Sequence, residues 1–319
     1  MVRIAIAGGS GQVAREIIDV LALGNKHEIL VLSRGPSSSN PEDFPPEISW
    51  QTVNYDDTDS IAGALKGIHT VLSFVQLLSD AGNKSQKNLI DACVRVGVKR
   101  FAPSEWGSAG LDDLPWWRGK QEIRECLARV NEKEKVLEYT LFQPGLFLEY
   151  LASPYKTAKH LSPLETIFDF QNRRAVIVDG HEDAIITLTS VHDLAEAVAT
   201  AVNYNGEWPV NGGIAGNRLT VSQVVAMGER IRGHPFAIER VKIEDLEKGE
   251  LKTSWMIGKR HAAVKEEEAA AMFKTVFIGM LLSTAKGAWD ISGGFGQLLK
   301  DLPFVSAEDY LSNVWNDAP

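Results

Sequence analysis

One stretch decides the fold of this chain: Arg3-Ile4-Ala5-Ile6-Ala7-Gly8-Gly9-Ser10-Gly11-Gln12-Val13-Ala14-Arg15-Glu16. Its pattern predicts a buried strand, a glycine turn and the start of a helix. Gly8 suits a tight backbone turn, Gly11 lets the main chain approach a pyrophosphate, and Ala14 keeps the helix close to the sheet. The free N–H groups and positive dipole end of that helix would face the phosphates. An apolar strand before the turn and a second strand after the helix favour a dinucleotide site over a structural turn.

The composition is typical of a globular protein. The 319 residues are 44% hydrophobic and 24% charged, with a formal net charge of −9. Phosphate binding needs a basic face, so this balance argues against a nucleic acid or an acidic membrane surface as partner. The most apolar later run, Phe277 to Leu282, is too short to cross a bilayer, and no secretory signal opens the sequence. We therefore expect a cytoplasmic protein that binds no membrane.

The cysteines and histidines show no ligand spacing. Cys93 and Cys126 are the only two cysteines, and they form neither a Cys-x-x-Cys motif nor a disulfide framework. Three histidines of the second half are possible metal ligands: His160, His181 and His192. Their separation gives no metal-binding pattern. We expect no metal site and a reduced environment.

Strand and helix patterns alternate through the first half. The predicted strands are 3–7, 28–33, 50–53, 69–74, 99–102 and 138–142. The predicted helices are 11–23, 58–66, 80–96 and 118–130. This alternation makes a parallel sheet with helices on both faces. We therefore expect the α/β class, with a Rossmann-type, doubly wound parallel sheet.

The pattern loosens in the second half, where loops carry aromatic residues. We expect residues 1–145 to form the Rossmann domain and 146–319 a smaller C-terminal substrate-binding region. Within the latter, segments at about 185–212 are expected to return to the Rossmann sheet. A helix is predicted over 194–202, with Asp193 as its start residue.

The residue after the second strand sets the nucleotide preference. A carboxylate there would receive a ribose 2′-hydroxyl, whereas an arginine would pair with a 2′-phosphate. The sequence has Ser33-Arg34-Gly35 at this place, so Arg34 favours NADP(H) over a role as an ordinary surface charge. Asp56 or Asp57 could approach the adenine amino group, and a helix-capping role is equally compatible with either.

Ligands of such sheets bind beyond the carboxyl ends of the strands. Together with the glycine turn, this rule selects the predicted cofactor-binding residues: Gly8, Ser10, Gly11, Gln12, Val13, Arg34, Val75, Gln76, Ser104, Lys120, Pro144 and Gly145. Lys120 follows the fifth strand on the predicted helix 118–130. A short-chain dehydrogenase has a tyrosine four residues before such a lysine as its acid. Here that position is Trp116, so the usual tyrosine mechanism is absent.

Aromatic residues gather in the segments that follow the fifth and sixth strands. Trp106, Trp116 and Trp117 are interpreted as a flat cage for a planar substrate, with core packing as the alternative. Phe147 and Tyr150 are expected to line the same cleft, with Tyr150 as a hydrogen-bond donor or as packing. Glu105 completes the predicted substrate-binding set; a hydrogen-bonded structural carboxylate is its alternative role.

Several of these motifs together resemble the isoflavone-reductase-like branch of the NmrA-like atypical short-chain dehydrogenases. They are Gly8 to Ala14, Ser33-Arg34, Phe101-Ala102-Pro103-Ser104-Glu105-Trp106-Gly107, Lys120 with Ile123-Arg124, Ser190 to Leu194, and Ser306 to Leu311. The resemblance spans nearly the whole chain and looks like a fungal-type member. It implies a Rossmann domain that binds NADPH and an aromatic-lined substrate cleft.

The resemblance also implies a role for Lys120. In the reductase branch the matching lysine is the proposed proton carrier, and it could equally hold the nicotinamide ribose. A lysine partly desolvated by tryptophan neighbours has a lowered pKa, which suits proton transfer near neutral pH. This sequence has Trp106 where the family motif usually has phenylalanine, and that departure bears on the substrate more than on the cofactor.

Three functions agree with the sequence. The first is NADPH-dependent reduction of an aromatic or heteroaromatic small molecule, in secondary metabolism, with hydride from the nicotinamide and Lys120 assisting proton transfer. The second is a redox-neutral cyclisation or condensation of an indole-like substrate with NADP⁺ retained. The third is a non-catalytic NADP(H) redox sensor of NmrA type. A monomer or a homodimer is expected in each case.

Overall fold

The computed structural model describes residues 1–35, 48–258, 269–296 and 298–316. Its largest sheet has six parallel strands in the order β3-β2-β1-β4-β5-β6. These strands are β1 (Val2–Ala7), β2 (His27–Ser33), β3 (Ile48–Thr52), β4 (Thr70–Ser73), β5 (Arg100–Ala102) and β6 (Glu138–Tyr139). This order reverses direction at β1 and is that of a doubly wound dinucleotide-binding sheet. The predicted fold class is confirmed.

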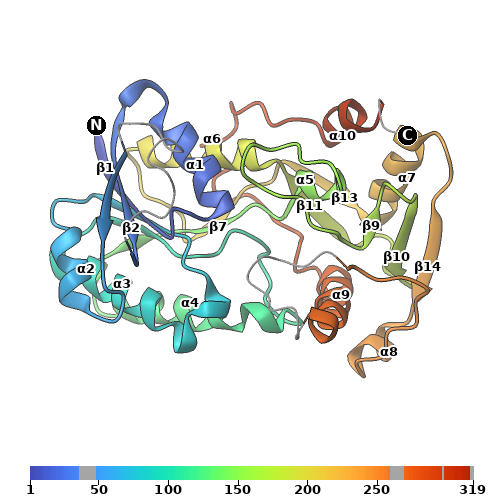
Figure 1. The fold of residues 1–319 in the computed structure, drawn as a ribbon, viewed down its shortest axis with the longest axis horizontal. Coiled ribbons are helices and arrows are strands. Elements are labelled where there is room, and N and C mark those ends of the chain that lie inside the picture. The colour runs from blue at the N-terminus through green and yellow to red at the C-terminus, as the bar shows by residue number, and fades with distance from the viewer. Residues whose placement is uncertain (36–47, 259–268, 297, 317–319) are drawn as a thin grey trace.

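Helices cover both faces of this sheet (Figure 1). They are α1 (Gln12–Ala22), α2 (Thr58–Ala64), α3 (Lys84–Val96), α4 (Arg118–Val130) and α6 (Val191–Asn203). α1 packs against α6 on one face, and α2 packs against α3 on the other. Side chains of β1 contribute to the cores on both faces. Ile4 and Ile6 pack on the side of α1 and α6, and Ala5 and Ala7 pack on the side of α2 and α3. All four are fully buried. Because side chains alternate between two covered faces, all four residues from Ile4 to Ala7 are apolar.

Several predicted elements have different bounds in the structure; α3, for example, starts at Lys84 and not at residue 80. The strand predicted over 138–142 is divided at Thr140 into β6 and β7 (Leu141–Gln143), and β7 pairs in parallel with β12 (Asn211–Gly213). Helix α6 begins at Val191, earlier than predicted, because the Ser190 side chain accepts a hydrogen bond from the Asp193 N–H and caps the helix. Asp193 therefore lies inside the first turn, and its carboxylate accepts from the Val305 N–H at 3.1 Å.

The second half adds smaller sheets and helices. Its remaining strands are β8 (Leu146–Phe147), β9 (Phe168–Asp169), β10 (Arg174–Val178), β11 (Ile185–Thr189), β13 (Asn217–Thr220) and β14 (Ala237–Val241). Its remaining helices are α5 (Leu148–Leu151), α7 (Val221–Arg232), α8 (Ile243–Glu247), α9 (Ala269–Ala285) and α10 (Ala307–Trp315). Strand β11 pairs with β8 and β13, and β10 pairs with β9 and β14. A separate apolar core holds these elements together.

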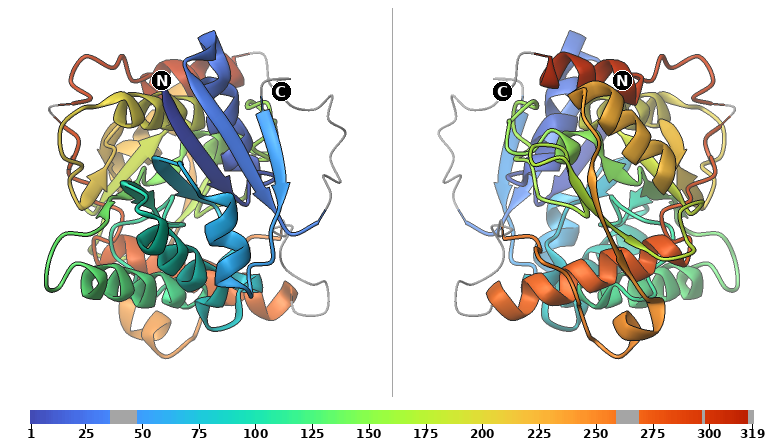
Figure 2. Two further views of the ribbon diagram at one scale, coloured as in Figure 1. Left: turned by 90° about the vertical axis from the view of Figure 1, so that its left-hand side faces the viewer. Right: turned by 90° about the vertical axis from the view of Figure 1, so that its right-hand side faces the viewer.

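Helix α9 is largely apolar, with Lys274 and Thr275 exposed. It lies across the lower side of the second half, as the red-orange helix in the right panel of Figure 2. Phe277 and Leu281 are fully buried in the core of this half. Phe273, Val276 and Met280 are only half-buried and lie on another side of the helix. A helix that is apolar on more than one face has a second surface to cover.

Glu149 is a buried carboxylate between α5 and α6. Only 3% of the residue is exposed. Both carboxylate oxygens accept hydrogen bonds from the Val191 N–H, at 3.1 and 3.2 Å. Burial raises the pKa of Glu149 to about 7. The start of α6 is thus held by a group that loses its proton near neutral pH.

This burial predicts a pH-dependent stability. The unfolded chain releases the Glu149 proton near 4.5 and the folded chain near 7, so the free energy of unfolding falls as pH rises through that window. Glu149→Gln keeps a carbonyl acceptor for Val191 without the charge. At pH 8 it should raise the free energy of unfolding by about 1–3 kcal/mol, and at pH 5 the gain should be smaller. Urea denaturation at both pH values, with exposed Glu134→Gln as control, tests this; an equal effect at both would contradict it.

Candidate functional site

A cleft of about 450 Å³ lies beyond the carboxyl ends of β1, β2 and β4. This is the place where the strand order reverses, at which doubly wound sheets bind their ligands. The predicted cofactor residues that line it are Gly8, Ser10, Gly11, Arg34, Val75 and Gln76. Tyr55, Trp50 and Asp80 also line it and were not predicted. No local motif marks these three, because Trp50 lies in β3, Tyr55 in the connection from β3 to α2, and Asp80 in the connection from β4 to α3.

The glycine turn has the backbone that only glycine adopts readily. Gly8 has φ +78°, and a Cβ there would lie 2.7 Å from the carbonyl oxygen of Phe74. The Gly11 N–H donates to the Gly8 carbonyl at 3.0 Å, and α1 then starts with neither a side-chain cap nor an acidic residue in its first turn. The first N–H groups of α1 and its positive dipole end are therefore open to an anion.

Gly8→Ala should weaken NADPH binding about 10- to 30-fold. The left-handed backbone costs an alanine roughly 1–2 kcal/mol, and the contact with Phe74 forces the turn to shift. Gly180→Ala is a matched control, because Gly180 also has positive φ (+77°) but a Cβ there would meet no atom within 4 Å. Fluorescence titration with NADPH measures the difference; equal losses in both variants would contradict a specific role for Gly8.

Arg34 lines the cleft, whereas Asp56 and Asp57 do not. Arg34 follows β2, is exposed and lines the cleft. Asp57 caps α2 by accepting from the Asp59 N–H at 2.9 Å, and Asp56 forms a 2.7 Å ion pair with Lys84. Neither aspartate lines the cleft, so Arg34 is the charged side chain at its nucleotide-discriminating position.

Two predicted cofactor residues on α1 have other contacts. The side-chain amide of Gln12 exchanges two hydrogen bonds of 3.1 Å with Ser162. One turn further along α1, Glu16 accepts from the N–H groups of His160 and Leu161. Val13 packs against the core beside α1. This face of α1 therefore holds the loop at 160–162, which continues into Leu164, Glu165 and Thr166 of the cavity described below.

The predicted residues after β5 and β7 lie behind the cleft. The Ser104 N–H donates to the buried side chain of Gln86 at 3.0 Å. Pro144 and Gly145 form the buried turn between β7 and β8. A Cβ on Gly145 would lie 2.3 Å from the carbonyl oxygen of Thr187, which explains glycine there by close packing. None of these three lines the cleft in the part of the chain that the structure describes.

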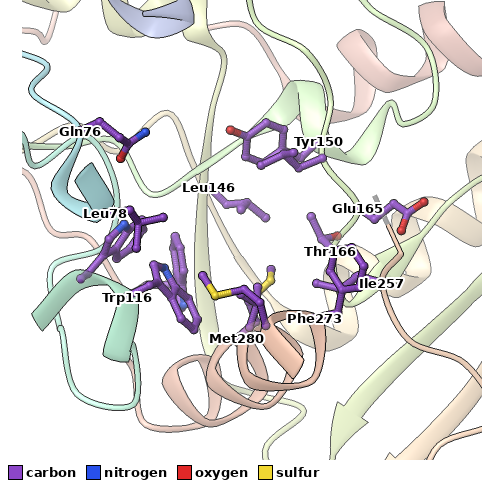
Figure 3. A pocket seen from close by; sticks show the side chains of 15 residues that line it. Gln76, Leu78, Trp116, Leu146, Tyr150, Glu165, Thr166, Ile257, Phe273 and Met280 are labelled. Carbon is purple, nitrogen blue, oxygen red and sulfur yellow. The ribbon is translucent and has the colours of Figure 1, made fainter. Parts of the chain in front are cut away.

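A second cavity, of about 240 Å³, adjoins the cleft (Figure 3). Trp116, Trp117 and Tyr150 line it, as predicted for the substrate region. Gln76 lines both this cavity and the cleft, so the two spaces meet at this residue. The remaining walls include Leu146 and residues that sequence reasoning missed: Leu164, Thr166, Ile257, Phe273, Val276, Met280 and Trp289. The spacing of Phe273, Val276 and Met280 places them along one side of α9, and this apolar side could have indicated from sequence that they line a cavity.

Two glycines make room for the tryptophans of this cavity. A Cβ on Gly107 would lie 2.6 Å from the Trp117 ring, and one on Gly279 of α9 would lie 2.7 Å from the Trp116 ring. The two rings meet edge to face with centroids 6.2 Å apart. The Trp116 and Trp117 rings thus pack directly on glycine backbone. A side chain at Gly107 or Gly279 would displace the ring beside it.

Trp106, Phe147 and Glu105 lie outside both spaces, which differs from their predicted place. Trp106 stacks on Phe74 with centroids 4.3 Å apart, and its ring N–H donates to the Ser73 carbonyl at 2.8 Å. Phe147 is buried and meets Tyr150 edge to face. The Glu105 carboxylate is occupied by two hydrogen bonds from the Arg124 guanidinium, at 2.7 and 2.9 Å. Packing and pairing account for all three.

Lys120 is buried next to the cavity wall. Only 3% of it is exposed; its ammonium donates to the backbone carbonyl of Glu105 and lies 3.5 Å from the centre of the Trp117 ring. Burial lowers the pKa of Lys120 to about 7, with Arg124 acting in the same direction and Glu105 opposing. Lys120 lines neither space itself and contacts the cavity through Trp117.

Two structural findings concern metals and membranes. Within the described ranges, no three His, Cys, Asp or Glu side chains come together in a way that could hold a metal ion. In the same part of the chain, none of the helices combines the length and the apolar character that a bilayer span requires.

Comparisons with known proteins show which family this chain belongs to. The model of the NmrA-like family matches residues 2–274. Oxidoreductase BOA1 of Botryotinia fuckeliana is 32% identical over 240 residues, which cover 74% of this chain and 78% of the relative. An isoflavone reductase structure superimposes with a TM-score of 0.68 at 21% identity and covers 98% of both chains. The NADPH complex of the Escherichia coli quinone oxidoreductase QOR2 also gives 0.68, at 20% identity, over 98% of this chain and all of that one.

Proposed function

The chain belongs to the NmrA-like family, and from that premise we propose that it is an NADPH-dependent oxidoreductase that reduces an aromatic or heteroaromatic small molecule. The observation that carries the proposal is the junction at Gln76, where a glycine-floored cleft meets a cavity walled by aromatic rings. A hydride-transferring enzyme needs two such spaces in contact. The fungal relative named an oxidoreductase, the isoflavone reductase and the quinone oxidoreductase support the same class. We also propose that the reaction belongs to secondary metabolism.

The residues of the cleft fit a phosphorylated dinucleotide. The open start of α1 would receive the pyrophosphate over the Gly8 turn, whose close packing on Phe74 leaves no room for a side chain. Arg34 would pair with the 2′-phosphate. When bound, NADPH supplies the hydride. The protein binds and orients the two ligands and excludes water from the apolar cavity.

Lys120 is proposed to assist proton transfer. A lysine with a pKa of about 7 exchanges its proton near neutral pH, where a general acid is most effective. Its ammonium contacts the ring of Trp117, and that ring lines the cavity. The ammonium also donates a hydrogen bond to the backbone carbonyl of Glu105, which fixes its position.

The test follows NADPH absorbance at the nicotinamide band while aromatic ketones, enones and quinones are added to the purified protein. We expect oxidation of NADPH in proportion to the substrate reduced. A protein that binds NADPH and forms product without net oxidation would instead carry out redox-neutral chemistry. A protein that binds NADPH and changes none of these compounds would contradict the reductase proposal.

A further inference from the structure

The cavity beside the cleft is almost entirely apolar, and its few polar residues differ in what they contact. The Thr166 hydroxyl donates to the Phe168 carbonyl at 3.1 Å, and the Glu165 carboxylate accepts from the Gly258 N–H at 2.6 Å. The hydroxyl of Tyr150 and the side-chain amide of Gln76 have no hydrogen-bond partner among the described residues. Polar groups left free in an apolar cavity are the ones that orient a ligand.

These two free groups face the same part of the cavity. In Figure 3 the Tyr150 hydroxyl projects from α5 toward the side of the cavity on which Gln76 lies. Gln76 also lines the cleft, whereas Tyr150 lines the cavity alone, so Gln76 marks the side of the cavity on which the cofactor would lie. The tryptophans and the α9 side chains that form much of the remaining wall offer an apolar surface to a flat ring.

Tyr150 is a neutral hydrogen-bond donor in the cavity. Burial, together with the nearby Glu149 carboxylate, raises the pKa of Tyr150 above its ordinary value. The phenol therefore keeps its proton throughout the neutral range and can donate a hydrogen bond. The Gln76 amide can donate a second one. A carbonyl oxygen has two lone pairs and no proton of its own, so it could accept a hydrogen bond from each of these donors.

We propose that Tyr150 selects the substrate: a planar aromatic ketone, enone or quinone whose carbonyl oxygen accepts a hydrogen bond from the Tyr150 hydroxyl, with the Gln76 amide beside it. This inference rests on the proposed reductase function and names its substrate class. A hydrogen bond to that oxygen strengthens as negative charge develops on it, so the same contact that orients the ring also favours reduction at the carbonyl. Aromatic molecules without an acceptor would bind by ring packing alone.

The experiment uses two probes of nearly equal shape, 1-tetralone and tetralin, which differ by the carbonyl oxygen. Their affinities for the full-length protein without cofactor are measured by ligand-observed NMR titration. The wild-type protein should bind 1-tetralone about 10-fold more tightly than tetralin. In Tyr150→Phe the two affinities should agree within about twofold, with tetralin binding unchanged. Tyr139→Phe, which removes a half-buried hydroxyl from β6 outside the cavity, should keep the wild-type preference.

The outcomes separate the two proposals. A Tyr150→Phe protein that retains the preference for 1-tetralone, or that loses both probes equally, overturns the role of the hydroxyl. Unchanged tetralin binding in that variant shows that the cavity is still formed. If neither probe binds the wild-type protein, both the inference and the aromatic substrate site are rejected. A preference for 1-tetralone in a protein that never oxidises NADPH would reject the reductase function and leave the carbonyl site standing.

Discussion

Lys120→Met should lower kcat about 100- to 10,000-fold while leaving NADPH binding within about threefold. Methionine has nearly the length of lysine and suits a buried position, so the variant removes the ammonium without opening a cavity against Trp117. The folded state should not suffer, because the buried amine itself carries a desolvation cost that methionine lacks. Loss of activity in a well-folded protein is therefore the expected result.

The dependence of kcat on pH provides a second test of the role of Lys120. An ammonium that donates a proton is effective below its pKa, so kcat in the wild-type protein should fall as pH rises through about 7. Stopped-flow measurement of NADPH oxidation between pH 5.5 and 9 resolves this limb, which Lys120→Met should lack. Lys133→Met, in the exposed loop after α4, serves as control and should keep both the rate and the profile. Wild-type turnover in Lys120→Met would assign Lys120 a structural role.

Arg34→Ser should weaken NADPH binding about 30- to 100-fold and leave NADH binding nearly unchanged. Arg34 is the charged residue at the 2′-phosphate position of the cleft, and a charge-assisted contact to phosphate is among the strong hydrogen bonds. The loss should shrink as salt is raised, because Arg34 is exposed.

Calorimetric titration with both dinucleotides measures this selectivity. Arg129→Ser on the exposed side of α4 is the control for a general loss of positive charge. If Arg34→Ser weakens NADPH and NADH equally, then Arg34 contributes to the shape of the cleft and not to recognition of the 2′-phosphate.

The fold could be predicted from sequence because its signals are local. The strand before Gly8, the turn itself and the alternation of periods along the first half each depend on neighbours within a few residues. The start of α6 does not follow from sequence alone, because Ser190 and Asp193 are equally good caps and lie three residues apart; in the structure the cap is Ser190.

The cleft was predicted better than the cavity for the same reason. A glycine turn after a strand indicates a phosphate site within one short stretch of sequence. The cavity, in contrast, is lined by α9 and by loops more than 100 residues away from it in sequence. Sequence also could not tell which aromatic residues face a ligand. Trp106 and Trp117 occur in one segment, yet the first stacks on Phe74 and the second lines the cavity.

Gly107 and Gly279, which pack against Trp117 and Trp116, would control the shape of the proposed substrate cavity. Neither Gly107 nor Gly279 lines the cavity, but a single methyl group at either would press against Trp117 or Trp116 and move that ring. Substrate range can therefore drift through mutations at positions that no ligand contacts. Comparing only the lining residues of two relatives would overlook this variation, and directed evolution of new substrates could begin at these two positions.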